Sequence, residues 1–236
     1  MIYINHNLKA IFIHIPKTGG SYIGPTLVQY YGFTCYLDVI SEKRLDHDLI
    51  CKSSNIKTGI EIYDNIFLNQ TIGILTYCRT SDYLNSKMNM DEDKWNIYTK
   101  FCFIRHPYDR LLSGWSHIKK IFNYKIELND YILKEPSHVS DIEYSHIFFE
   151  QQKHIEYNGS CGVNIIGRFE YLEQDFVKIL KTIGINRNRI IHKPKKVNVS
   201  RPEKGDNIIM DINVIRKANE IFKNDFELFH YLHYIC

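Results

Sequence analysis

The chain has 236 residues, of which 44% are hydrophobic and 14% aromatic, so it can bury a sizeable core. This composition excludes a natively disordered protein. The net charge is only +3, and the charged residues, 24% of the total, are of both signs, so nothing marks the chain as a nucleic-acid binder. Any preference for anions must therefore be local.

Cysteines and histidines show no metal-binding pattern. The six cysteines form no Cys-x-x-Cys pair and no Cys/His cluster at zinc spacing, so we expect no bound metal. Their even number leaves disulfides open in an oxidising compartment. Cys102 stands in an apolar run and is expected to be a buried small hydrophobe.

From their sequence, the N-terminal residues are not expected to form a signal peptide or a transmembrane segment. The first apolar run, Ala10 to Ile15, is far too short to span a bilayer. This favours a soluble cytoplasmic protein. A Golgi-lumen protein is the alternative if an anchor preceded these residues.

In chain order, the first regular pattern is a strand, a loop and a helix. Residues 10–15 form a short β-branched run that ends at Pro16, and residues 21–31 are expected to form a helix closed by Gly32. The pattern repeats at 101–104, an apolar strand before Arg105, where Pro107 takes a favoured first helical position.

The second half of the chain continues the alternation. We expect a strand at 163–166, an amphipathic helix at 172–183 and a last helix over 215–229. Alternating strands and helices predict an α/β fold: a single P-loop-like domain, residues 1–236, with a mainly parallel central sheet flanked by helices. The less periodic residues 34–69 and 125–158 are expected to be loops that contact an acceptor.

The loop after the first strand has the composition of an anion-binding site. Gly19 and Gly20 let the backbone approach an anion, and Lys17 supplies a mobile cation. Thr18 and Ser21 add hydroxyl donors. The alternative is a plain strand-to-helix turn with Lys17 in solvent. A Walker A loop does not fit, because its lysine follows the second glycine, whereas Lys17 precedes the glycine pair.

A second candidate anion site follows residues 101–104. Arg105 ends this strand and offers planar donors matched to a phosphate, and Ser113 stands about two helical turns further on. Both side chains could reach one phosphate. The alternative is that Arg105 pairs with Asp109 while Ser113 merely packs.

Together the two segments resemble the sulfotransferases that use 3′-phosphoadenosine-5′-phosphosulfate (PAPS), in the carbohydrate branch that includes heparan sulfate O-sulfotransferases. In that family a Pro-Lys-Thr-Gly-Gly-Ser/Thr loop holds the 5′-phosphosulfate, which here is residues 16–21. An Arg-x-Pro-x-x-Arg-x-x-Ser stretch holds the 3′-phosphate, matched by Arg105, Pro107, Arg110 and Ser113.

The resemblance implies the reaction and further cofactor contacts. An acceptor hydroxyl would displace adenosine 3′,5′-bisphosphate (PAP) from sulfur, with Lys17 neutralising the departing phosphate and no metal required. Weaker family features are Gly167 to Leu172 and Asn224 to Phe229. Ser200 and Arg201 lie where relatives close a loop over the nucleotide, and are candidates for the 3′-phosphate side.

The general base is not assigned by the resemblance. Many carbohydrate sulfotransferases carry a catalytic histidine upstream of the 3′-phosphate arginine, and residues 76–83 contain none. Asp82 is the nearest carboxylate there, and His47, flanked by acids, is the best upstream imidazole. His117, His138, His146 and His154 lack metal-ligand spacing and are interpreted as surface or packing residues.

The sequence leaves three functions open. The first is a sulfotransferase that acts on a glycan or another hydroxyl-bearing acceptor. The missing upstream histidine motivates the second, a non-catalytic module that binds PAPS or PAP. The third is a P-loop kinase-like phosphotransferase, which the position of Lys17 argues against.

Overall fold

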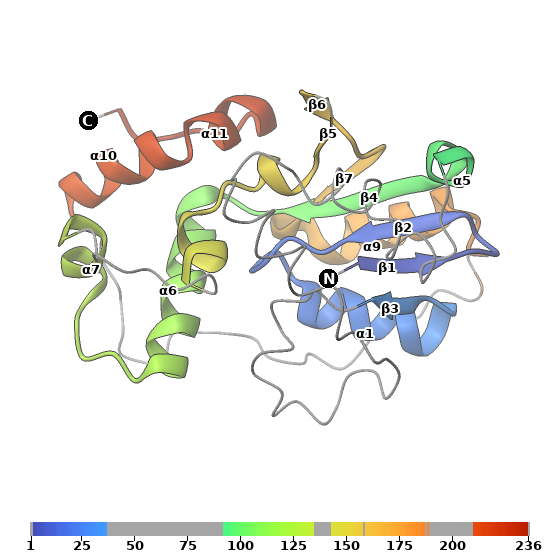
Figure 1. Cartoon of the computed structure of the whole chain (residues 1–236), viewed down its shortest axis with the longest axis horizontal. Helices are drawn as coiled ribbons and strands as arrows, with labels where there is room; N and C mark the ends of the chain where they lie inside the picture. Colours follow the sequence, from blue (N-terminus) through green and yellow to red (C-terminus); the bar gives the residue numbers. More distant parts are fainter. Residues whose placement is uncertain are drawn as a thin grey trace.

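A five-stranded sheet forms the centre of the computed structural model, which describes residues 2–36, 92–134, 143–157, 159–186, 188 and 210–235. The strands lie in the order β3-β1-β2-β4-β7 (Figure 1). Their bounds are β1 Ile2–Asn5, β2 Ala10–Ile13, β3 Thr34–Tyr36, β4 Thr99–Ile104 and β7 Ile165–Arg168.

Four of these five strands run in the same direction. β2 pairs in parallel with β4, with Phe12 opposite Phe101, and β4 pairs in parallel with β7, with Phe103 opposite Gly167. β1 is antiparallel to both its neighbours, β2 and β3, so β3 runs in the direction of β2. The expectation of an α/β fold with a mainly parallel sheet is confirmed, while β1 and β3 were not predicted.

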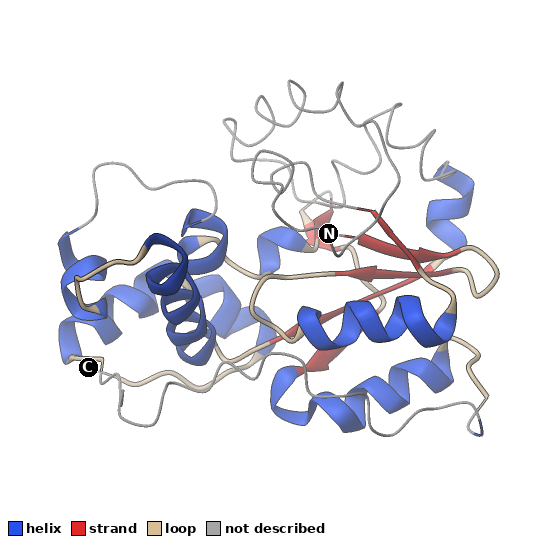
Figure 2. Ribbon diagram, turned by 90° about the horizontal axis from the view of Figure 1, so that it is seen from below, coloured by secondary structure: helices blue, strands red, loops and turns tan. Residues whose placement is uncertain are grey.

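Two helices cover one face of this sheet. They are α1, Gly20–Tyr31, and α9, Leu172–Thr182, which lie side by side below the strands (Figure 2). Phe12 stacks on Phe101, with ring centroids 5.3 Å apart, and both belong to one buried cluster with Leu27 and Phe176. Because side chains alternate across a strand, the neighbouring Ile11 is buried on the opposite face.

A second core is purely helical and lies beside the sheet (Figure 1). Trp115 packs there against Tyr131, with ring centroids 4.6 Å apart. The elements that supply this core are α6 Pro107–Phe122, α7 Leu128–Lys134, the π-helix η2 Tyr144–Phe148, α10 Ile212–Ile221 and α11 Lys223–Phe229. The remaining elements are α5 Glu92–Ile97, η3 Gln152–His154, β5 Glu156–Tyr157, β6 Ser160–Cys161 and η4 Phe169–Tyr171.

Three sequence predictions need correction. The last helix, expected over 215–229, is two helices that meet at the buried Phe222. The strand expected at 163–166 begins at Ile165 instead. Residues 125–158 are not simply loops, because residues 128–134 form α7, whose apolar residues fall at helical spacing and pack on α6.

Candidate functional site

The two predicted anion-binding segments meet at one edge of the sheet. β2 and β4 are parallel neighbours, so the residues that follow them leave the sheet side by side. Ligands of α/β sheets bind at this carboxyl edge. The Nη1 of Arg105 donates to the carbonyl oxygen of Lys17 at 3.4 Å. The second segment therefore touches the first, as the hypothesis of a shared site requires.

The loop after β2 is shaped to present backbone donors. Lys17 has a φ of 70° and Gly19 a φ of 95°, both in the left-handed region, which is uncommon for a lysine. Thr18 is fully buried, and its hydroxyl donates to the carbonyl of Ile15 at 2.8 Å. In the described structure, no backbone N–H of residues 17–21 donates to another protein group. These donors converge at the start of α1, where the helix dipole also favours an anion.

The two glycines of the loop are required by close contacts. A Cβ on Gly20 would lie 1.9 Å from Nε2 of His14, whose ring packs against the start of α1. A Cβ on Gly19 would come within 3.2 Å of the Phe169 ring, and its φ also disfavours a side chain. Because these two positions have no side chain, the loop can pack directly against His14 and Phe169.

Positive charge gathers at this edge. Burial, together with the charges of Arg105 and Arg110, lowers the pKa of Lys17 to about 8. Burial also lowers the pKa of Arg105, against the opposite effects of Asp109 and Glu170. Such a concentration of cations is costly without an anion, so the site is suited to a negatively charged ligand.

The side chain of Arg105 is held in place, but not all of its hydrogen-bond donors are used within the described residues. Its guanidinium lies over the Phe169 ring, 4.3 Å from the centroid. Its Nε is buried and, within the described residues, has no hydrogen-bond partner. It makes no ion pair with Asp109, which was the alternative interpretation. A buried donor without a partner is rare in native structures, and this one is suited to a phosphate oxygen of a ligand.

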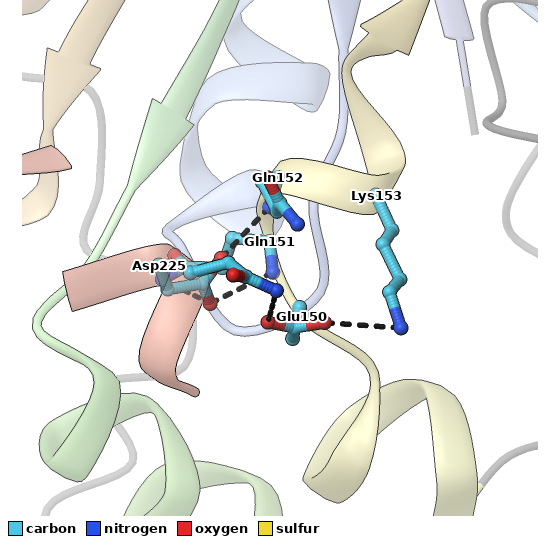
Figure 3. Close-up of polar contacts among 6 residues, drawn as sticks. Glu150, Gln151, Gln152, Lys153 and Asp225 are labelled. Carbon is cyan, nitrogen blue, oxygen red and sulfur yellow. Dashed lines mark hydrogen bonds and ion pairs between the residues drawn. The ribbon is translucent and has the colours of Figure 1, made fainter. Parts of the chain in front are cut away.

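A buried network fixes the backbone of Arg105. Gln151 accepts from the Arg105 N–H at 2.8 Å and donates to the Arg105 carbonyl at 2.9 Å. Asp225 of α11 in turn accepts from the backbone N–H groups of Gln151, at 2.8 Å, and Gln152, at 2.9 Å (Figure 3). Burial raises the pKa of Asp225, although these bonds act in the opposite direction. The C-terminal helix therefore holds the arginine that ends β4.

Arg110 has a different place from the one that the resemblance implied. Its side chain is 1% exposed, its Nε donates to the Pro16 carbonyl at 3.1 Å, and its Nη2 donates to the Ser145 carbonyl at 3.1 Å. Burial lowers its pKa to about 10. Arg110 thus supports the loop from within the protein, a role that sequence reasoning missed because both partners are distant backbone groups.

The other predicted residues fall into two groups. Ser21 is exposed on the first turn of α1, and Ser113 is half-buried on α6, three residues after Arg110. His47, Asp82, Ser200 and Arg201 lie outside the described residues, so their assignments stay predictions.

The structure brings together two histidines, His117 and His146, that the sequence analysis interpreted as surface or packing residues. The rings of His117, on α6, and His146, on η2, are stacked with centroids 5.1 Å apart. The charge of Lys17 lowers the pKa of both His14 and His117, after the larger effect of burial. No spacing along the chain signals this grouping, because it depends on how α6 packs against η2.

Among the described residues, no helix is long and apolar enough to cross a membrane. No cluster of three or more His, Cys, Asp or Glu side chains in the same part of the chain could hold a metal ion. Cys102 is fully buried, as expected, and among the described residues Cys102 and Cys161 form no disulfide.

A glycine-containing loop and an arginine stand together at the carboxyl edge of a mainly parallel sheet, an arrangement of an α/β protein that is suited to an anionic ligand. The chain belongs to the sulfotransferase family, whose family model matches residues 1–232. A curated relative, carbohydrate sulfotransferase 10 of Gallus gallus, is 24% identical over 264 residues. The alignment covers 98% of this chain and 66% of the relative, so the chain spans about two thirds of the relative's length. No solved structure matches significantly.

Proposed function

We propose that this chain is a single P-loop-like domain, residues 1–236, that transfers the sulfuryl group of PAPS to a hydroxyl group. The observation that carries the proposal is the set of backbone N–H groups at residues 17–21 and the buried Nε of Arg105, none of which has a hydrogen-bond partner among the described residues. One anion at the loop and a second at Arg105 match the two ends of a 3′-phosphorylated, 5′-phosphosulfated nucleotide.

Each residue has a distinct task in this proposal. The loop amides, with Thr18 and Ser21, hold the 5′-phosphosulfate, and Lys17 neutralises the phosphate oxygen that departs from sulfur. Arg105 and Ser113 hold the 3′-phosphate, with Ser200 and Arg201 as further candidates. PAPS supplies the activated sulfuryl group, and PAP is the product.

The acceptor is proposed to be a carbohydrate hydroxyl. The relative from Gallus gallus is named as a carbohydrate sulfotransferase, and its alignment extends over nearly the whole chain. His47 and Asp82 remain the sequence-based candidates for the base. A glycan hydroxyl is a weak acid, so its attack on sulfur benefits from a neutral base within hydrogen-bond reach.

A transfer assay tests this function. The protein is incubated with PAPS labelled in the sulfate and with unsulfated glycans, tyrosine peptides and small alcohols, and labelled products are detected by mass. We expect label on a glycan, and none with the Lys17→Ala variant. Binding of PAP without transfer to any acceptor would instead support the non-catalytic module.

A further inference from the structure

Two histidine rings are stacked between α6 and η2. The centroids of His117 and His146 are 5.1 Å apart, and the ring planes are 29° from parallel. The hydroxyl oxygen of Ser145 lies 3.1 Å from Nδ1 of His146, which restrains that ring. A Cβ on Gly114 would be 2.2 Å from the His146 carbonyl oxygen, so α6 and η2 are in backbone contact. The stack is therefore a fixed feature of the fold.

This pair is tied to the anion-binding loop through one buried side chain. Arg110 donates both to the carbonyl of Pro16, the residue before Lys17, and to the carbonyl of Ser145, the residue before His146. A single guanidinium thus bridges the loop and η2. Along α6, His117 is seven residues after Arg110 and four after Ser113, which places the three on one face of the helix.

The imidazole of His117 is able to accept a proton in this position. Its side chain is half-buried, and neither ring nitrogen has a hydrogen-bond partner among the described residues. Burial, followed by the charges of Lys17 and Lys120, lowers its pKa to about 4. The imidazole is consequently neutral at neutral pH and carries a lone pair on one nitrogen.

We propose that His117 is the proton acceptor for the attacking hydroxyl, held in place by its stack on His146. This inference rests on the proposed sulfotransferase function. The acceptor oxygen forms a bond to sulfur, and the bond from sulfur to the 5′-phosphate oxygen breaks. The electron pair stays on that phosphate oxygen beside Lys17, while the hydroxyl proton moves to the free nitrogen of His117.

The charges around His117 explain why a weakly basic imidazole serves this role. Lys17 and Lys120 are the charged groups that act on it, both of them positive, and His146 is stacked on its ring. A bound phosphosulfate next to Lys17 offsets that charge. The pKa of His117 therefore rises when the nucleotide is bound, and a pKa nearer the working pH makes a better general base.

Substitutions distinguish the role of His117 from the roles of neighbouring residues. With the glycan on which the wild-type protein transfers label, His117→Gln should lower turnover by about 100-fold or more and leave PAP affinity within about threefold. His146→Phe keeps an aromatic stack and should lose less than about tenfold, whereas His146→Ala should lose more. His6→Gln is the matched control, because His6 bonds Tyr98 at the opposite end of the sheet and should change nothing.

A second measurement reports on His117 without turnover. The ring protons of His117 are titrated by NMR with and without PAP, with loop amide shifts as the sign that PAP is bound. We expect PAP to raise the pKa of His117 by at least one unit, with the ring signals of His6 as the control that should not respond to PAP.

The outcomes distinguish the two proposals. If PAP does not bind, the proposed function fails together with this inference. If PAP binds and label is transferred, but His117→Gln keeps full turnover while His47→Gln or Asp82→Asn abolishes it, only His117 is overturned. An unchanged pKa of His117 in the PAP complex would also overturn its assignment.

Discussion

Arg110 and Pro16 are joined by a hydrogen bond of 3.1 Å from a buried guanidinium to the carbonyl that precedes Lys17. Helix α6 contains Ser113, which is proposed to bind the 3′-phosphate. Through Arg110, the same helix also supports the backbone of the loop that is proposed to bind the 5′-phosphosulfate. Arg110 thus connects the two halves of the proposed nucleotide site, and a change at Arg110 should affect both.

Replacing Arg110 with methionine tests this coupling. Arg110→Met leaves the carbonyls of Pro16 and Ser145 without their donor and removes a positive charge near Asp225. We expect a loss of about 2–4 kcal/mol in the free energy of unfolding, measured in urea, together with weaker PAP binding. The exposed Arg216→Met should change neither quantity, and a stable Arg110→Met that binds PAP normally would argue against a supporting role.

Gln151 and Gln152 form a matched pair for testing the support of Arg105. The Gln151 side chain bonds both backbone groups of Arg105, whereas Gln152 meets Asp225 through its backbone N–H, which alanine retains. Gln151→Ala should cost about 1–3 kcal/mol of stability and weaken PAP binding about tenfold, while Gln152→Ala should be close to neutral. Equal effects of the two substitutions on calorimetric affinity would contradict this prediction.

The affinity for PAP should depend on the protonation of Lys17. Its pKa in the ligand-free protein is about 8, and a bound anion raises it, so binding is tightest below pH 8. Affinity should fall as the pH rises above 8, by at most about tenfold per unit, with uptake of protons on binding. Lys17→Arg keeps its charge at these pH values and should remove the dependence in titrations from pH 6.5 to 9.5.

The contact between Gly20 and His14 predicts a non-additive pair of substitutions. Gly20→Ala places a methyl group 1.9 Å from the imidazole, which should destabilise the protein by about 2–3 kcal/mol and distort the loop. Removing the ring in the double variant His14→Ala/Gly20→Ala should restore part of that loss, with a coupling energy above about 1 kcal/mol. If the two substitutions have additive effects on the free energy of unfolding, the predicted steric contact between the two residues is contradicted.

The sequence predicted those parts of the site that are formed by residues close together in the chain. The loop at 16–21 is recognisable from its glycines and lysine after an apolar run, and Arg105 directly follows a predicted strand. β1 was missed because Ile2–Asn5 is short and runs into the polar residues that turn it back antiparallel onto β2. Local composition therefore reveals motifs better than it reveals short strands.

The rest of the site depends on contacts between distant residues. Gln151 meets Asp225 across 74 positions, and His117 meets His146 only because α6 and η2 pack closely at Gly114. No periodicity within one segment encodes such pairs. The supporting groups and the free histidine consequently emerge only when the helices are assembled.

The most direct test of the central claim is a calorimetric titration of the protein with PAP and, separately, with ATP and magnesium. The proposal predicts tight binding of PAP, weak or no binding of ATP, and at least about tenfold weaker PAP binding in both Lys17→Ala and Arg105→Ala. A preference for ATP, or PAP binding that neither substitution weakens, would contradict a PAPS site built from these two residues.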